Sequence, residues 1–203
     1  MKQISRPFNI VILPPKNISQ KAISISKKLR VKGGLFTLGN KVYFPHVTLY
    51  MAEFPLKNIP KIKSLLQKFV IKIKPFNLNS SDYRQSPGGY VDVAYKKSKK
   101  IKDIQKSLID LLNPLREGLI MESDKERLHT SIKTEQKNIK LYGYRYAKSQ
   151  FDPHITFTKL KEYNTSAVAM PKTDFSFKAE SVAIFSKGEH GTCNKLIKKF
   201  NLQ

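Results

Sequence analysis

The sequence predicts an α+β fold in which each half of the chain contributes one histidine-bearing strand. Strand and helix patterns follow the order β–α–β–α–β–β–α–loop–β–β–β, which is typical of α+β proteins. A phrase of the form Pro-His-(β-branched)-Thr-apolar occurs twice, at residues 45–49 and 153–157. The 203 residues suffice for one compact domain or two closely packed lobes. We therefore expect a single domain over residues 1–203.

Apolar spacing defines the elements expected in the first half of the chain. A β-branched run bounded by prolines predicts the first strand, and a helical period that stops at Gly33-Gly34 predicts the first helix. Two short apolar runs around Gly39-Asn40 predict a hairpin-like approach to the first phrase. The expected ranges are a strand at 8–13, a helix from 17 to the glycine pair, hairpin arms at 35–38 and 42–44, a strand at 46–51 and a helix at 57–71.

The second half is expected to add one long helix and most of the strands. The helix begins at Ser98 and carries isoleucines and leucines at helical spacing as far as Leu112. Residues 117–150 are polar and mixed in charge, which predicts an exposed excursion near the second phrase. The expected strands are 76–83, 90–95, the second phrase from residue 154, 175–185 and 192–202.

Both repeated phrases are expected to form strands that face one cleft. Side chains alternate between the two faces of a strand, so each histidine shares a face with the residues two and four positions later. The polar face of the first strand would carry His46, Thr48 and Tyr50, and that of the second His154, Thr156 and Thr158. A proline is well placed before each strand, where its missing N–H costs little.

Two histidines with threonines beside them suit the chemistry of a phosphodiester. The reference pKa of histidine lies near 6.5, so one imidazole accepts a proton while the other donates one at the same pH. We expect His46 and His154 to be this acid–base pair. The hydroxyls of Thr48 and Thr156 would donate hydrogen bonds to non-bridging phosphate oxygens as charge builds there.

The alternatives to this site are weaker. A single His-x-Thr sequence is weak evidence for a catalytic site, because any strand can contain one. Two copies with the same preceding proline and the same apolar interleaving are much stronger evidence. The chain lacks a His-x-x-x-His pair, a thiolate cluster, a Gly-x-Ser-x-Gly elbow and a phosphate-binding glycine loop. We therefore expect neither a metal nor a cofactor.

Several other residues have two interpretations. His129 fits a loose His-x-Ser/Thr pattern without the proline, and we expect an exposed loop histidine. His190 lies in a glycine-flanked turn and is interpreted as a surface residue in preference to a substrate contact. Tyr144 and Arg145 lie in a tyrosine-rich segment that either stacks on bases or packs onto the body of the protein. The candidate substrate contacts are Tyr50, Thr158 and Tyr144.

The charge favours an anionic partner. The chain has 38 Lys and Arg against 15 Asp and Glu, a net charge of +23. Such a surplus concentrates polyanions, so RNA or a nucleotide is the expected partner, and a merely solvated basic surface is the alternative. The single Cys193 excludes an internal disulfide framework, and no apolar run approaches the length of a membrane span. We expect a cytoplasmic protein without an obligate protein partner.

The paired phrases at 45–49 and 153–157 resemble those of the 2H phosphoesterase superfamily, which contains 2'-5' RNA ligase-like and 2',3'-cyclic phosphodiesterase proteins. The resemblance implies a bilobal, pseudo-twofold fold with antiparallel sheets lining a central cleft and helices outside. It implies metal-independent hydrolysis, or reversible ligation, of 2',3'-cyclic or 2',5'-linked phosphodiesters. For the cyclic case it implies that His46 is the acid and His154 the base, with Thr48 and Thr156 binding phosphate.

Other functions remain open at this point. A non-catalytic RNA- or nucleotide-binding module on the same fold is the rival, supported by the charge and by the Tyr-Arg segment. A small nucleotide or a non-nucleic cyclic phosphate, such as an ADP-ribose derivative, is a third substrate class. The segment 117–150 is interpreted as an expansion of the family's layout, which leaves the substrate class undecided.

Overall fold

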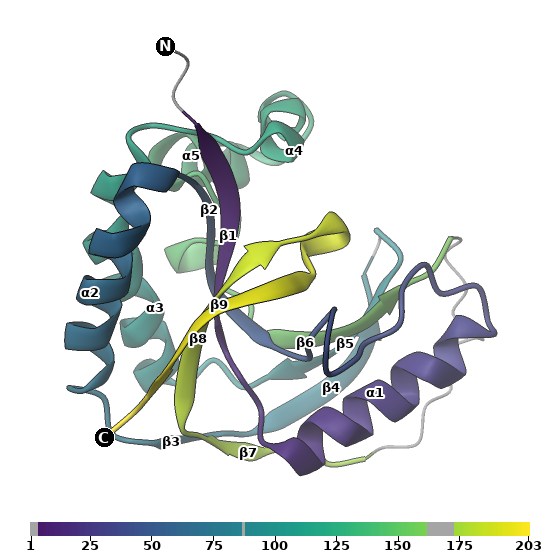
Figure 1. The fold of residues 1–203 in the computed structure, drawn as a ribbon. Coiled ribbons are helices and arrows are strands. Elements are labelled where there is room, and N and C mark those ends of the chain that lie inside the picture. Colours follow the sequence, from purple (N-terminus) through teal and green to yellow (C-terminus); the bar gives the residue numbers. More distant parts are fainter. Residues whose placement is uncertain (1–3, 87, 162–172) are drawn as a thin grey trace.

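The computed structural model describes residues 4–86, 88–161 and 173–203 and has the predicted α+β architecture (Figure 1). In the first half, β1 and α1 lead through a long connection to β2, and α2 follows. The bounds are β1 Ser5–Ile12, α1 Lys16–Arg30, β2 Val47–Pro55, α2 Ile59–Val70, β3 Phe76–Leu78, β4 Ser80–Gln85, β5 Tyr90–Tyr95, α3 Lys99–Leu112, α4 Glu122–Lys125, α5 Lys133–Tyr142, β6 His154–Lys159, β7 Phe177–Ala179, β8 Ser181–Lys187 and β9 Cys193–Asn201.

Antiparallel sheets carry the two histidine strands. One sheet has the order β2-β1-β8-β9, a second has the order β4-β5-β6, and β3 pairs with β7. The first phrase opens β2 and the second opens β6, so each of the two larger sheets holds one histidine phrase.

The two halves repeat one unit and exchange their helices. In the first unit α1 lies between β1 and β2 in the chain, and in the second α3 lies between β5 and β6. Yet α1 packs against β6 of the other sheet, and α3 packs against β2 (Figure 1). Buried residues of both sheets and of all three long helices belong to one hydrophobic core. The fold therefore has the pseudo-twofold arrangement that the resemblance implied.

Amphipathic spacing explains why α1 lies where it does. Its buried positions include Ile18, Ala22, Ile25 and Leu29, which recur every three or four residues and form one apolar stripe. After the helix, Gly34 makes a close contact with β6. A Cβ at Gly34 would lie 2.8 Å from the Thr158 hydroxyl oxygen, so only glycine lets the chain pass here without displacing its neighbours.

The hairpin predicted at 35–38 and 42–44 is wrong, because neither range forms a strand. Only one backbone hydrogen bond joins the arms, from Gly39 N to Tyr43 O at 3.2 Å. Two other N–H groups bond elsewhere, with Leu35 N donating to Lys159 O at 2.8 Å and Leu38 N to the Ser26 hydroxyl at 2.8 Å. This segment therefore belongs to the edge of β6 and to α1.

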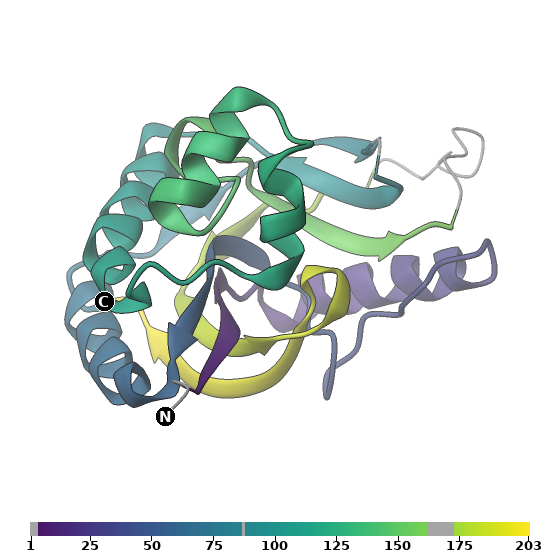
Figure 2. The same ribbon diagram turned by 90° about the horizontal axis from the view of Figure 1, so that it is seen from above.

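Residues 117–150 are not the exposed excursion that their polarity suggested. They contain α4 and α5, and Met121, Ile139, Tyr144 and Ala147 are buried. In Figure 2 this segment covers one side of the molecule, with α4 near the turn of the β8–β9 hairpin. The few apolar residues of the segment thus suffice to pack it onto the body.

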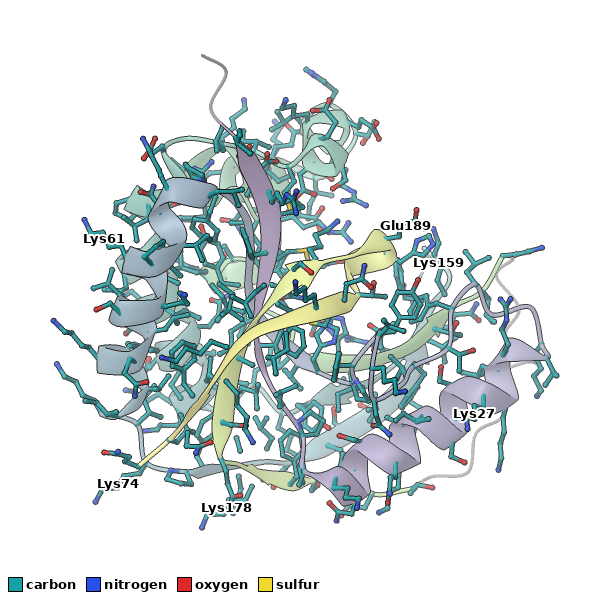
Figure 3. The ribbon with its side chains drawn as sticks, in the orientation of Figure 1. Lys27, Lys61, Lys74, Lys159, Lys178 and Glu189 are labelled. Carbon is teal, nitrogen blue, oxygen red and sulfur yellow. The ribbon has the colours of Figure 1, made fainter. Side chains whose placement is uncertain are left out.

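The positive charge is distributed around the fold. Figure 3 shows Lys27 on α1, Lys61 on α2, Lys74 ahead of β3 and Lys178 on β7 extending outward from different sides. All four side chains are exposed. Among the described residues, no helix is both long and apolar enough to cross a membrane.

Candidate active site

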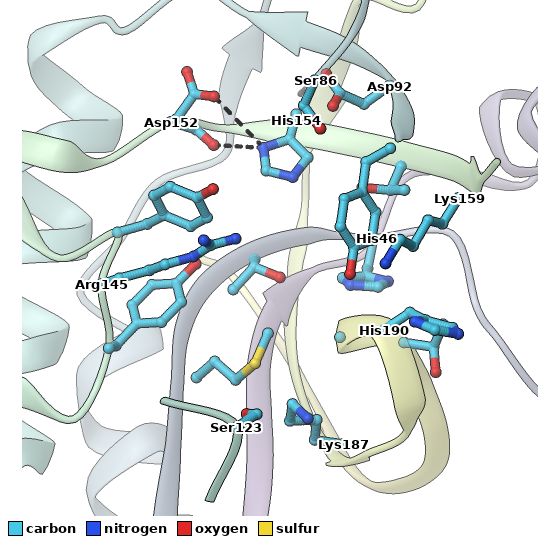
Figure 4. Close-up of a pocket in the computed structure, with 18 of the residues that line it drawn as sticks. His46, Ser86, Asp92, Ser123, Arg145, Asp152, His154, Lys159, Lys187 and His190 are labelled. Carbon is cyan, nitrogen blue, oxygen red and sulfur yellow. Dashed lines mark hydrogen bonds and ion pairs between the residues drawn. The ribbon is translucent and has the colours of Figure 1, made fainter. Parts of the chain in front are cut away.

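The four predicted site residues line one cleft. His46 and Thr48 reach it from β2 and its approach, and His154 and Thr156 reach it from β6. The cleft has a volume of about 550 Å³. Figure 4 shows His46 and His154 on different sides of this space. Alternation within each strand thus keeps a histidine and a threonine together, and the fold brings the two pairs to one place.

Both imidazoles are held in the same way. Nδ1 of His46 lies 2.7 Å from the carbonyl oxygen of Phe44, and Nδ1 of His154 lies 2.7 Å from the carbonyl oxygen of Asp152. A carbonyl oxygen only accepts, so Nδ1 carries the proton in both rings and Nε2 is left for chemistry. The proline between each carbonyl and its histidine keeps the preceding residue extended, which favours this contact.

A β-bulge interrupts each histidine strand at the same point. The register of β2 against β1 shifts at Leu49, which has no partner of its own. The register of β6 against β5 shifts in the same way at Phe157. Because a bulge adds one residue on one strand, the alternation of side chains moves by one position beyond it.

The bulges overturn the prediction for Tyr50 and Thr158 as cleft residues. Both side chains are fully buried. The Tyr50 hydroxyl donates to Tyr142 O at 2.7 Å, and the Thr158 hydroxyl donates to Phe36 O at 2.7 Å. Both therefore stabilise the fold. The cleft-facing residues beyond the bulges are instead Met51 and Lys159.

Tyr50→Phe tests the structural role of this tyrosine. The variant removes the donor to the carbonyl of the half-buried Tyr142, so we expect the free energy of unfolding to fall by about 1 kcal/mol. Catalytic efficiency should not change, since the ring keeps its place. Urea denaturation and steady-state kinetics measure the two quantities. A loss of activity at unchanged stability would instead assign Tyr50 to the substrate.

His46 lies in a less polar environment than its partner. Burial lowers its pKa to about 4, and the nearby His154 acts in the same direction. The side-chain amide of Asn9, which is fully buried on β1, lies 3.3 Å from Nε2 and also donates to Gly191 O at 3.3 Å. With Nδ1 protonated, this amide donates to the lone pair of Nε2. His46 is therefore neutral near pH 7.

Asn9→Asp is expected to raise the pKa of His46. A carboxylate beside Nε2 favours the charged imidazolium, which moves the pKa upward from about 4. An NMR titration follows the ring signals, assigned by their loss in His46→Ala. Asn9→Leu has a similar volume and no charge, and should leave the pKa below its usual range. An unchanged titration midpoint in Asn9→Asp would contradict this account of the contact.

His154 lies among carboxylates. Asp152 Oδ2 is 3.9 Å from its Nδ1, as the dashed lines in Figure 4 indicate. Arg84 bridges Asp152 and the buried Asp92, with its Nε 2.7 Å from Asp92 Oδ1. Burial raises the pKa of Asp92, and the charges of His154 and Arg84 oppose that rise. Burial acts on Asp152 in the same direction, but Arg84 outweighs it and its pKa is lowered. Arg84, together with Lys97 at 3.2 Å from Asp152 Oδ1, balances the charges of the two carboxylates beside His154.

The tyrosine-rich segment forms one wall of the cleft. Tyr144 is buried, packs edge-on against Tyr50 with ring centroids 6.2 Å apart, and still lines the cleft. The guanidinium of Arg145 lies 4.3 Å from the centre of the Tyr146 ring. The segment thus packs onto the body, as one interpretation held, and Tyr144 remains a candidate substrate contact.

Of the other two histidines, His190 lines the cleft and His129 does not. His129 is exposed and does not line the cleft. His190 does line it, stacked on Phe36 with ring centroids 6.0 Å apart, and its backbone has a φ of 55°. His190 is exposed in a turn, as the preferred interpretation held, and it lines the cleft as well. A positive φ in a residue other than glycine is strained, and such strain is frequent at functional sites.

Sequence reasoning missed Asn9, Asp92, Arg84 and Lys187. A signal existed for the first two, since each is the one strongly polar residue in an otherwise apolar strand core. A buried polar group must find a partner, and here the partner of Asn9 is His46 and that of Asp92 is Arg84. Arg84 and Lys187 had no comparable signal among 38 basic residues.

Comparisons with known proteins agree with this geometry. The sequence matches the family model of the 2'-5' RNA ligase superfamily over residues 28–191, whereas no curated protein matches it. TT0787 of Thermus thermophilus has a similar fold, with 16% identity, a TM-score of 0.64 and 97% of each chain covered. E. coli LigT complexed with phosphate has 18% identity, a TM-score of 0.55 and 98% of each chain covered. LigT complexed with 3'-AMP has 14% identity, a TM-score of 0.59 and 98% of each chain covered.

At these identities the structural likeness shows a common fold, and the family follows from the sequence match. That match spans 28–191 of the 203 residues and contains both histidine phrases. The chain therefore belongs to the 2'-5' RNA ligase superfamily, within the 2H phosphoesterases.

Proposed function

We propose that the protein is a metal-independent phosphodiesterase that acts on 2',3'-cyclic or 2',5'-linked phosphodiesters of RNA or nucleotides. The observation that carries the proposal is the pair His46 and His154 in one cleft, each with Nδ1 bound to a backbone carbonyl. Nε2 of each ring can then act on one substrate; at His46 the hydrogen bond from the substrate replaces the 3.3 Å contact from the Asn9 amide. General acid–base help contributes about 10²–10⁴-fold per group.

In this proposal His46 is the base and His154 the acid. His46 is neutral near pH 7 because its pKa is lowered to about 4, so Nε2 takes a proton from the attacking water or hydroxyl. His154, with the Asp152 carboxylate 3.9 Å from its Nδ1, then gives a proton to the leaving sugar oxygen. These roles are the reverse of those that the family resemblance implied.

The threonines act on the phosphate itself. Thr48 and Thr156 are half-buried and line the cleft on the same strands as the histidines. Their hydroxyls donate to the non-bridging oxygens, where negative charge grows as the new bond forms. Tyr144 is the substrate contact retained from the sequence prediction.

The experiment that tests the proposal is a substrate panel. The protein is incubated with 2',3'-cyclic, 3',5'-cyclic and 2',5'-linked substrates, with and without EDTA, and the position of the product phosphate is determined. We expect turnover of the 2',3'-cyclic or 2',5'-linked class at the same rate in EDTA. A mixture of 2',3'-cyclic and 5'-hydroxyl RNA ends tests the reverse, ligating reaction. Loss of turnover in EDTA would contradict the two-histidine mechanism.

A non-catalytic RNA-binding module is the second candidate, and the net charge of +23 favours it. The outward-facing lysines in Figure 3 suit contacts with phosphates on many sides. RNA binding with a steep salt dependence, without cleavage of any member of the panel, would decide for this candidate.

A further inference from the structure

A second positive group lies in the cleft, away from the histidine pair. Lys187 ends β8, and Arg127 follows α4 in the short helix Glu126–Leu128; both line the cleft. In Figure 4 Lys187 and Ser123 lie near the lower end of the pocket, and His154 lies near the upper end. The segment 117–150 therefore supplies part of this end of the cleft.

The charges of this group do not cancel. Arg127 donates to Asp124 Oδ1 at 2.8 Å, and the Asp124 side chain is only 4% exposed. That ion pair is complete, so Lys187 adds one positive charge beside it. Within the described ranges, no carboxylate comes within ion-pair distance of Lys187.

Lys187 is also partly removed from water. Burial lowers its pKa, and Arg127 lowers it further while Asp124 opposes the change. A desolvated cation that faces a cleft and lacks a carboxylate of its own is stabilised when a ligand brings an anion. Arg127, fixed in place by Asp124, is ready to share that anion.

We propose that Lys187 and Arg127 bind a second, non-reacting phosphate of the substrate, an inference that rests on the proposed function. The reacting phosphate lies between the histidines, and the second lies at the Lys187 end of the cleft. The preferred substrate then carries at least two phosphates. The second is either a 5'-terminal phosphate or the phosphodiester of the neighbouring nucleotide.

Three substrates and one variant test the site. Adenosine 2',3'-cyclic phosphate carries one phosphate, its 5'-phosphorylated form carries a terminal second one, and the ApA dinucleotide with a cyclic end carries an internal second one. We expect wild-type kcat/KM to rise about tenfold or more when the second phosphate is present. In Lys187→Ala the ratio of kcat/KM with the second phosphate to kcat/KM without it should fall towards one. Lys195→Ala removes an exposed lysine of β9 outside the cleft and should keep the wild-type ratio.

A binding measurement tests the Lys187–Arg127 site even if the proposed phosphodiesterase activity is absent. Calorimetric titration compares 3'-AMP with adenosine 3',5'-bisphosphate on wild type and on Lys187→Ala. If no cyclic substrate is turned over, tighter binding of the bisphosphate that disappears in Lys187→Ala still supports the site. The proposal is overturned if Lys187→Ala keeps the wild-type preference in the kinetic comparison and in the titration alike. The substrate whose second phosphate raises kcat/KM shows whether the site takes a terminal or an internal phosphate.

Discussion

Replacing either cleft histidine with alanine is expected to lower kcat by about 10²–10⁴-fold, because each ring performs one of the two proton transfers. The fold should persist. Both side chains are half-buried, and each loses one hydrogen bond to a backbone carbonyl, which is worth about 1 kcal/mol. His46→Ala also removes the acceptor of the Asn9 amide. The loss in the double variant should be smaller than the product of the two single losses, since the rings act as a unit.

The matched control is His129→Ala. His129 is exposed and outside the cleft, so its replacement should leave kcat and the unfolding midpoint unchanged. Steady-state kinetics on the substrate found in the panel measures the first, and circular dichroism during urea denaturation the second. Full activity in His46→Ala or His154→Ala would remove the two-histidine mechanism.

An activated leaving group should rescue His154→Ala and leave His46→Ala inactive. In a nucleoside 2'-(4-nitrophenyl phosphate), 4-nitrophenolate replaces the departing 5'-oxygen of a 2',5' linkage and leaves without a proton. Loss of the acid then matters little, and the deficit of about 10²–10⁴-fold should shrink by at least tenfold. Loss of the base is as harmful as before, because the nucleophile still has to lose its proton.

The variant that the activated leaving group rescues lacks the acid, and the variant that stays inactive lacks the base. Rescue of His46→Ala instead would make His154 the base of this cleavage. The pH profile provides a second measurement, since a base works only when it is unprotonated. With the pKa of His46 at about 4, kcat/KM should keep its value down to about pH 5 and fall only below that. An acid limb near neutrality would contradict this role for His46.

The histidine–threonine pairs were predictable because nothing interrupts the strands between each His and its Thr. Alternation alone then places both side chains on one face. The next positions were not predictable in this way. The bulges at Leu49 and Phe157 arise from the pairing of β2 with β1 and β6 with β5, and that pairing is absent from any local pattern. Tyr50 and Thr158 were therefore assigned to the wrong face.

Two further elements were predicted wrongly because their contacts cannot be read from the local sequence. The hairpin at 35–44 failed because its backbone groups bond to β6 and α1, which lie far from each other in sequence. The segment 117–150 looked exposed because its apolar residues are sparse, yet Tyr144 and Ile139 are enough to pack it. Both errors come from contacts that form only once the two halves are together.

The exchange of helices between the two halves bears on how the protein folds. Strand β2 is covered by α3 and shares its sheet with β8 and β9, so its surroundings come from the far end of the chain. Strand β6 likewise depends on α1 from the beginning of the chain. Such non-local pairing slows folding, because a large loop must close before its contacts form. In a fragment that ends before β8, strand β1 would have an open sheet edge, and β2 would pair with a strand that lacks its other neighbour.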